Sequence, residues 1–460
     1  MQEFESQGVW YLPTKPTNEV VGVLRYSLRS GLLLSLTGTL SKDFNRGAGS
    51  YALIYGLVAD NPYGRFVTLV DCFQRRSTLA IPGFASEQIR ANRAYIGSLH
   101  LRTEEESQFL SVRASYTHLA EWSGLTGFTR LLAERPTPGT IAARYQKPAP
   151  LELVVEQERR LRVEVEASVV QGNKRFEIDE RVELTLSGGG TFSSLEPLRS
   201  FVSPFEDFLT FAVDAPSPAE EILFTAESTE GTVRRESIYL IYQPVFQGGE
   251  KNGTPIARDK LFRWPDVRYS HPELVGRWFR FRRDYKAACD TYFGFQYAPP
   301  TYLETKVLLL HIALGLFLVD RVHDEVIQRA LASLRQAALT PRDESWLRIL
   351  PSAEELSLPW ATLALIQDYG DILVPALGAE PERFVTELLT ARHDLFHPPD
   401  VPGPRRSSQL HLLHLIERLS LLIKVRILES LGFSREEISG LLSENQRYLN
   451  LASGRLAKEE

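Results

Sequence analysis

Cysteine and histidine are scarce in this chain of 460 residues, and each scarcity narrows the classes of site that it can contain. The two cysteines, Cys72 and Cys289, lie far apart, so they build neither a disulfide framework nor a cysteine zinc site. So few cysteines are typical of a reducing compartment, and we expect a cytoplasmic protein. The histidines number nine, so two of them placed four residues apart require an explanation.

Long apolar runs are also missing. The most apolar stretch, residues 307–319, is too short to span a bilayer and contains His311. It therefore predicts a buried helix, with His311 as a satisfied core histidine. The N-terminus has no basic segment followed by an apolar run, so we expect no signal peptide and no membrane partner.

Positive charge is not in excess either. The net charge of −6 argues against a surface covered in basic residues for non-specific binding of nucleic acid. It leaves room for a local basic cleft. A hydrophobic content of 43% with 24% charged residues is ordinary for a globular protein, and the length is enough for two or three domains.

The hydrophobic pattern changes from strands to helices along the chain. Strand patterns lie at 22–38, 51–59, 66–73, 109–124 (ending in a short strand or turn), 161–170, 176–186 and 235–246, with a helix at 195–213 that Pro204 kinks or splits. We expect the strands at 161–170 and 176–186 to pair with each other. Helical patterns lie at 273–293, 302–338, 353–369, 381–396, 407–431 and 434–448. Gly432 is expected to end one helix, and Ser434 and Glu437 to form the capping box of the next.

This organisation predicts an α+β multidomain protein. A β-rich domain occupies residues 1–250 and an all-α helical bundle occupies residues 261–460. Between them, residues 251–260 are the predicted linker, because the surrounding segment is rich in glycine, polar and charged residues.

The segment ARHDLFHPPD, residues 391–400, ends the helix predicted at 381–396. His393 and His397 are four residues apart and share a helix face, and two prolines stop the helix behind them. At about 3.6 residues per turn, Arg392 lies about 100° from His393 and about 140° from His397, so a regular helix does not aim Arg392 and His397 at one point. Unwinding before the prolines, or a second copy across a two-fold axis, would bring such groups together.

An imidazole and a guanidinium suit the cleavage of an RNA phosphodiester. With a pKa of about 6.5, an imidazole takes a proton from a 2′-hydroxyl or gives one to the departing 5′-oxygen. A guanidinium holds a phosphate with two hydrogen bonds and stabilises the charge that builds in the transition state. Because the 2′-hydroxyl is the nucleophile, this chemistry requires no metal ion, and we expect no cofactor.

The hexapeptide RHDLFH, from Arg392 to His397, resembles the R-x4-6-H signature of HEPN ribonucleases. The helix before it, the proline-rich loop and the long helix after it also resemble that family. Together with GVWYLP (8–13), SLTGTL (35–40), VTLVDCF (67–73) and THLAEWSG (117–124), it resembles the ApeA-like branch of anti-phage HEPN proteins over nearly the whole chain.

This resemblance implies a metal-independent endoribonuclease of abortive-infection type that leaves 2′,3′-cyclic phosphate and 5′-hydroxyl ends. It implies a homodimer through the helical domain, with His397 as general acid or base, Arg392 on the scissile phosphate and His393 in support. The β-rich domain would sense a phage-derived trigger or regulate the nuclease. The substrate is RNA, and transfer RNA is one candidate.

One position departs from the family pattern. Members of the family that it resembles often carry an acidic residue in an A-L-E-like sequence of the first long helix, where this chain has Gly315. If that acid orients the arginine or the histidine, its role passes to Glu304 or Asp320, or is lost.

Two basic pairs are candidates for contact with RNA. Arg405 and Arg406 begin a helix, where the dipole favours acids, so they indicate an external anion unless they form a solvated helix start. Arg282 and Arg283 belong to RWFRFRRDYK, residues 277–286, where basic and aromatic residues alternate. That stretch also suits a helix with its aromatic residues in the core and its arginines outward.

Two other functions stay open. His393, His397, His411 and His414 have the spacing of a four-histidine metal site in a hydrolase, with Asp394 or Glu417 as a carboxylate ligand. Alternatively, the helical domain only dimerises or binds a partner, without catalysis.

Overall fold

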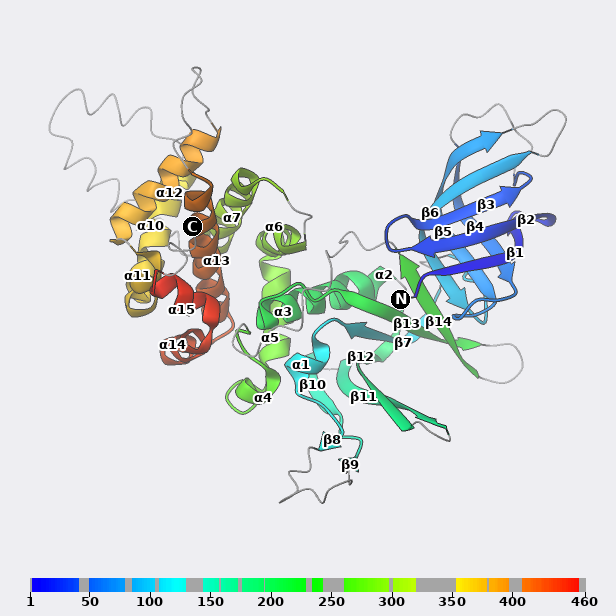
Figure 1. The fold of residues 1–460 in the computed structure, drawn as a ribbon, viewed down its shortest axis with the longest axis horizontal. Coiled ribbons are helices and arrows are strands. Elements are labelled where there is room, and N and C mark those ends of the chain that lie inside the picture. The colour runs from blue at the N-terminus through cyan, green and yellow to red at the C-terminus, as the bar shows by residue number, and fades with distance from the viewer. Residues whose placement is uncertain are drawn as a thin grey trace. The chain divides into compact units, whose positions relative to one another are not determined.

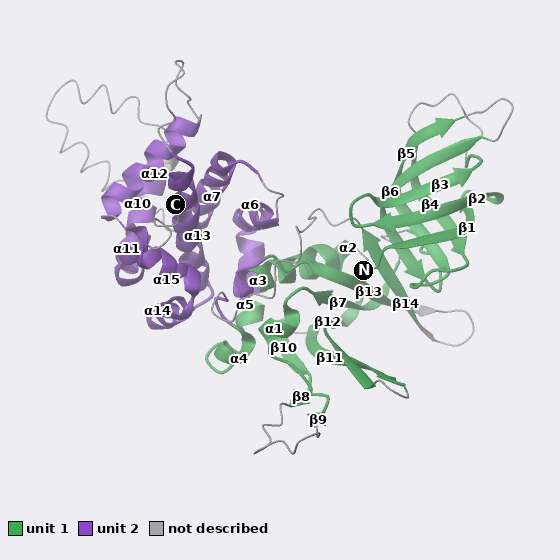
Figure 2. Ribbon diagram, viewed as in Figure 1, with its two compact units in different colours: residues 1–210, 216–250, 263–276 green, residues 211–215, 251–262, 277–460 purple. Residues whose placement is uncertain are grey.

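The computed structural model describes residues 2–40, 49–78, 85–103, 107–129, 144–156, 159–172, 176–193, 195–228, 234–242, 260–297, 301–319, 353–378, 380–396 and 408–454. The chain divides into two compact units (Figure 2). Unit 1 comprises residues 1–210, 216–250 and 263–276, and unit 2 comprises residues 211–215, 251–262 and 277–460. The predicted linker lies outside the described residues except for Lys260, so the domain boundary stays a prediction.

Unit 1 is built on antiparallel β-structure (Figure 1). Within the described residues, a twelve-stranded sheet contains β1 (Phe4–Leu12), β2 (Lys15–Ser27), β3 (Gly31–Thr37), β4 (Ser50–Val58), β5 (Phe66–Thr78), β6 (Ser86–Gly97), β7 (Phe109–Tyr116), β10 (Leu151–Glu156), β11 (Arg159–Gln171), β12 (Phe176–Phe192), β13 (Ala219–Ser228) and β14 (Arg234–Tyr242). A separate short pair consists of β8 (Phe128–Thr129) and β9 (Arg144–Tyr145).

The first six strands close into a ring. Their order is β6-β3-β2-β1-β4-β5, and β5 pairs with β6 as well as with β4. Side chains alternate between the two faces of each strand, so one face of every strand turns inward. Trp10, Leu34, Leu69 and Ile89 are fully buried in the resulting core. Closure pairs both edges of these strands, which removes exposed edges from this part of the sheet.

Strand β6 joins the ring to the rest of the sheet. Its first half, Ser86–Ala91, pairs with β3, and its second half, Arg93–Gly97, pairs with β14. The sheet then continues in the order β14-β13-β7-β12-β11-β10. The predicted pairing of 161–170 with 176–186 is confirmed, because β11 and β12 form one long hairpin.

Short helices complete unit 1. They are α1 (Leu119–Ser123), α2 (Leu195–Pro197), the π-helical turn η1 (Leu198–Val202), the start of α3 (Ser203–Val213) and α4 (Trp264–Val267). The irregular turn directly before Pro204 agrees with the predicted kink. The strand or turn predicted at the end of 109–124 is wrong: α1 forms there between His118 and Gly124, both in the left-handed region at φ 69° and 68°.

Unit 2 is helical. Its helices are α6 (Lys286–Tyr297), α7 (Leu303–Phe317), α10 (Ala353–Asp368), α11 (Gly370–Leu377), α12 (Pro381–Phe396), α13 (Gln409–Ser430), α14 (Arg435–Glu444) and α15 (Gln446–Ala452), together with the larger part of α5 (Leu274–Asp284). The predicted fold class, a β-rich region followed by a helical region, is confirmed. In the described part of the chain, no helix combines the length and apolarity needed to cross a membrane.

Capping explains where the helices of unit 2 begin and end. The predicted capping box is confirmed, since Ser434 accepts from the Glu437 N–H at 3.2 Å and the Glu437 carboxylate accepts from the Ser434 N–H. The single helix predicted at 434–448 is wrong, because Asn445 caps a new helix by accepting from the Tyr448 N–H at 3.1 Å. The helix predicted at 273–293 similarly divides at Tyr285 into α5 and α6.

Replacing Gly56 by alanine should destabilise unit 1. A Cβ atom on Gly56 of β4 would overlap the buried indole of Trp10, and the closed ring leaves that indole no room to move. Overpacking of this kind costs about 1–3 kcal/mol of unfolding free energy, which denaturant unfolding would measure. Gly440→Ala is the contrasting variant, because nothing lies within 4 Å of its added Cβ in α14; a similar loss there would contradict the packing argument.

Candidate functional site

Helix α12 carries Arg392 into the helical core. Its buried side chains, Val385, Leu388 and Ala391 among them, recur at helical spacing and form one stripe. Arg392 lies four residues after Leu388 and seven after Val385, so it continues that stripe and is half-buried. His393 is turned by about 100° and is exposed. The helix bounds agree with the predicted 381–396.

Helix α7 packs against α12 and presents a histidine to the core. His311 is 4% exposed and lies in the buried stripe of α7 with Val307 and Leu314. Neither ring nitrogen has a hydrogen-bond partner among the described residues. Burial, followed by the positive charge of Arg392, lowers the pKa of His311 to about 4. His311 is therefore neutral at physiological pH.

The other predicted catalytic residue is not described. His397 follows the last described residue of α12, and Arg405 and Arg406 also lie outside the described residues. The structure thus packs the helix of Arg392 against the helix of His311, while the relation of Arg392 to His397 stays a prediction. The prediction that His311 is a satisfied core histidine is half right: it is buried in the core, but its ring nitrogens lack partners.

The histidines of α13 make different contacts. His411 places Nδ1 3.4 Å from Oε1 of Glu387 on α12, and the guanidinium of Arg418 lies 3.5 Å from the same oxygen. The Nε2 atom of His414 is buried without a partner among the described residues. Within that part of the chain, no three histidine, cysteine or acidic side chains are grouped to hold a metal ion. The predicted four-histidine site also includes His397, which lies outside the described residues.

The basic stretch at 277–286 adopts the packed arrangement. Trp278 and Phe281 are buried, and their rings contact each other with centroids 5.7 Å apart. Arg282 pairs with Asp290, and Arg283 lies 3.6 Å from the carboxylate of Asp284. These ion pairs account for both arginines within the protein, and their contact with RNA stays a prediction.

Gly315, where the family pattern has an acid, faces apolar surroundings. A Cβ atom there would lie 3.6 and 3.9 Å from the methyl groups of Leu358 on α10. Glu304 is in the first turn of α7, and Asp320 lies outside the described residues. His311 stands one turn before Gly315 on the same helix face.

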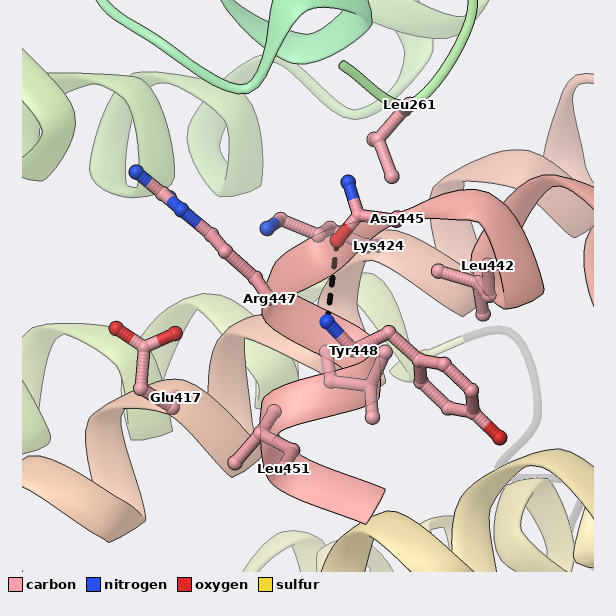
Figure 3. Close-up of a pocket in the computed structure, with 9 residues that line it drawn as sticks. Leu261, Glu417, Lys424, Leu442, Asn445, Arg447, Tyr448 and Leu451 are labelled. Atoms are coloured by element: carbon pink, nitrogen blue, oxygen red, sulfur yellow. Dashed lines mark hydrogen bonds between the residues drawn. The ribbon is translucent and has the colours of Figure 1, made fainter. Parts of the chain in front are cut away.

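A small pocket elsewhere in unit 2 gathers buried charge (Figure 3). It is lined by Leu261, Glu417, Leu421, Lys424, Leu442, Asn445, Arg447, Tyr448 and Leu451. Lys424 donates to the carboxylate of Asp214 at 2.7 Å, and Arg447 lies 3.3 Å from the same carboxylate. Lys424 and Asp214 are 7% and 9% exposed. We read this cluster as structural, because both cations face the carboxylate of Asp214.

Asp214→Asn should destabilise unit 2 by about 3 kcal/mol, because the buried ammonium of Lys424 would lose its counter-charge. Asparagine tolerates the left-handed conformation of Asp214, at φ 56°, so backbone strain does not confuse the result. Lys424→Met should cost less, since Arg447 still faces Asp214. Denaturant unfolding of both variants checks this, and a larger loss for Lys424→Met would contradict it.

Acidification should weaken the folded protein through His311. Its folded-state pKa of about 4 lies below the ordinary value of 6.5, so between these values only the unfolded chain binds the proton. Stability from this group is therefore present above pH 6.5 and falls by about 2 kcal/mol from pH 7 to pH 5. His311→Leu removes this dependence. The measurement is the difference in unfolding free energy between wild type and variant at both pH values; a constant difference would count against it.

One comparison with known proteins gives a match. A family model described as ApeA N-terminal domain 1 matches residues 5–278, more than half of the chain. No curated protein and no solved structure matches. The match covers the strands of unit 1 and ends before α7 and α12, so it supports the predicted ApeA-like family, and the predicted resemblance of the helical half stays a prediction.

Proposed function

This chain belongs to the family defined by ApeA N-terminal domain 1 and is an anti-phage defence-type protein, and from that premise we propose that its helical unit is a metal-independent endoribonuclease. The observation that carries the proposal is the position of Arg392 in the last turn-and-a-half of α12, half-buried and in line with the buried residues of that helix. An arginine held by a helix core offers a guanidinium with little freedom, as a phosphate ligand requires.

The proposed reaction is an intramolecular transesterification. The 2′-oxygen of the RNA attacks the neighbouring phosphorus, a bond forms between them, and the bond from phosphorus to the 5′-oxygen breaks. One imidazole accepts the 2′-hydroxyl proton and another proton is delivered to the 5′-oxygen. The products are a 2′,3′-cyclic phosphate and a 5′-hydroxyl. His397 is the proposed acid or base, Arg392 binds the scissile phosphate, and His393 supports proton transfer.

A homodimer is part of the proposal. The reaction needs a proton acceptor and a proton donor, and Arg392 and His397 diverge by about 140° on a regular helix. A second copy related by a two-fold axis would supply the missing group from its own motif. We place the protein in the cytoplasm, where cellular RNA such as transfer RNA is available, and assign to unit 1 the recognition of a phage-derived trigger.

The four-histidine metal site has less support. Three of its four members, His393, His411 and His414, are described, and they do not gather with an acid into a metal-binding group there. His411 instead faces Glu387 and shares it with Arg418. A non-catalytic module remains the other outcome of the test below.

His397→Ala should abolish RNA cleavage by the full-length protein. Wild type and variant would be incubated with total cellular RNA, with and without EDTA and with lysate from phage-infected cells as the source of a trigger, and the fragment ends mapped. We expect cleavage by wild type, resistant to EDTA, with cyclic-phosphate ends, and a loss of at least about 100-fold in the variant. His411→Asn is the matched control and should retain cleavage.

Each other outcome points to a different function. Loss of wild-type cleavage in EDTA would indicate a metal-dependent hydrolase. Cleavage retained by His397→Ala would remove His397 from the reaction. If the wild type cleaves no RNA under any of these conditions, the result would favour the non-catalytic binding module.

A further inference from the structure

Strands β5 and β6 carry an excess of positive charge. The two strands lie side by side in the ring of unit 1 (Figure 1). Their charged residues are Arg75, Arg76, Arg90 and Arg93, with the acids Asp71 and Glu87. Asp71 pairs with Arg93. Glu87 is 1% exposed and accepts hydrogen bonds from the Tyr51 hydroxyl and the Leu40 N–H, so its charge is held within the ring. The outer surface of these strands is therefore basic, in a chain whose net charge is −6.

An aromatic ring lies among these arginines. Cys72 and Ile89 are buried in the core of the ring of strands, so the residues next to them, Phe73 and Arg90, point to its outer face. Phe73 and Arg90 are directly opposite each other in the β5–β6 ladder. Since opposite residues have Cβ atoms about 5 Å apart, the guanidinium of Arg90 can reach a group that is stacked on the phenyl ring.

The combination of ring and cations matters more than either alone. Phe73 is 50% exposed, and a single exposed apolar side chain is ordinary. Here the exposed ring stands beside exposed Arg75, Arg76 and Arg90 on a closed set of strands. Proteins bind single-stranded nucleic acid with these two groups, because aromatic rings stack on bases and guanidiniums hold phosphates. A duplex hides the faces of its bases, and an acidic protein surface would leave the ring unused, so a single strand fits best.

We propose that the surface formed by Phe73, Arg75, Arg76 and Arg90 is a docking site for single-stranded RNA, and that this RNA is the substrate of the helical unit. A base stacks on Phe73, and the flanking phosphates lie on the arginines. We expect little sequence preference, because every base has an aromatic face and phosphate contacts carry no base information. The surface stands on unit 1 alone, whereas its role for the substrate rests on the proposed ribonuclease function.

The first test measures binding to the full-length protein. It uses fluorescence anisotropy of a labelled oligouridylate of about twelve nucleotides, with His397→Ala in every protein so that the RNA stays intact. Phe73→Ala and Arg90→Gln should each weaken binding about 10-fold, through loss of the stacked base and of a phosphate contact. Two matched controls on exposed positions outside the ring, Phe176→Ala and Arg160→Gln, should bind as the parent does. Equal binding by all variants would overturn the proposal.

Salt and competitors identify the chemistry of the partner. For a single strand, the slope of log affinity against log salt is about −0.7 per phosphate held, so Arg76→Gln and Arg90→Gln should each reduce it by about 0.7. Phe73→Ala should lower the affinity and leave the slope unchanged. An RNA duplex of the same length should bind more weakly, without sensitivity to Phe73→Ala. If poly-L-glutamate displaces the oligouridylate at equal charge concentration, the surface fits an acidic protein and the RNA proposal fails.

The second test measures cleavage, now with His397 intact. Phe73→Ala and Arg90→Gln should raise KM about 10-fold with kcat unchanged, because a docking contact binds ground state and transition state equally. An unchanged KM would overturn the substrate role.

The two tests separate the two proposals. If the wild type cleaves no RNA but the Phe73 and Arg90 variants lose binding, the docking site stands and the ribonuclease function fails. If the wild type cleaves RNA and these variants bind as the parent does, the ribonuclease stands and the docking site fails.

Discussion

Unit 1 depends on the way that one strand divides its hydrogen bonds. Strand β6 pairs with β5 along one edge and with two successive partners, β3 and β14, along the other. The pairing with β3 closes the ring, and the pairing with β14 attaches the remaining strands. Because Gly97 at the end of β6 lies against the backbone of Ser237 in β14, a side chain there would separate the ring from the extension. The sheet therefore holds together through a few residues of one strand.

The helical core of unit 2 contains buried charged side chains, and each of them requires hydrogen-bond acceptors or a counter-ion. Arg426 of α13 is 6% exposed and donates to the Phe317 carbonyl at the end of α7 and to the Tyr285 hydroxyl, both at 3.0 Å. Glu429 accepts from the same guanidinium at 2.8 Å. Lys424, which precedes Arg426 on the same helix, donates a hydrogen bond to the carboxylate of Asp214. Each buried cation is matched to acceptors of its own geometry, so the core specifies one arrangement of these helices.

Much of the fold was predictable from sequence because it follows local periodicity. The β11–β12 hairpin and the bounds of α12 follow from alternating and helical spacing of apolar residues, and the capping box at Ser434 follows from side-chain chemistry alone. The failures lie at single residues. The break at Asn445 and the short helix α1 depend on single capping or left-handed residues, which periodicity averages away.

The candidate site was also predictable from the sequence only in part. Arg392 was identified because the motif is contiguous, and its position on the buried stripe follows from helical spacing. His311 was correctly predicted to be buried, but that its ring nitrogens lack partners depends on the packing of other helices around it, which the sequence of α7 alone does not show.

The order of the strands has a consequence for synthesis. All six strands of the ring come from residues 4–97, so they leave the ribosome together and can close early. The edge of Arg93–Gly97 is different, because β14 begins only at Arg234. A nascent chain thus presents an open strand edge while the intervening residues are made. A strand from a neighbouring chain could pair with that open edge, so the edge is the part of the nascent sheet most exposed to aggregation.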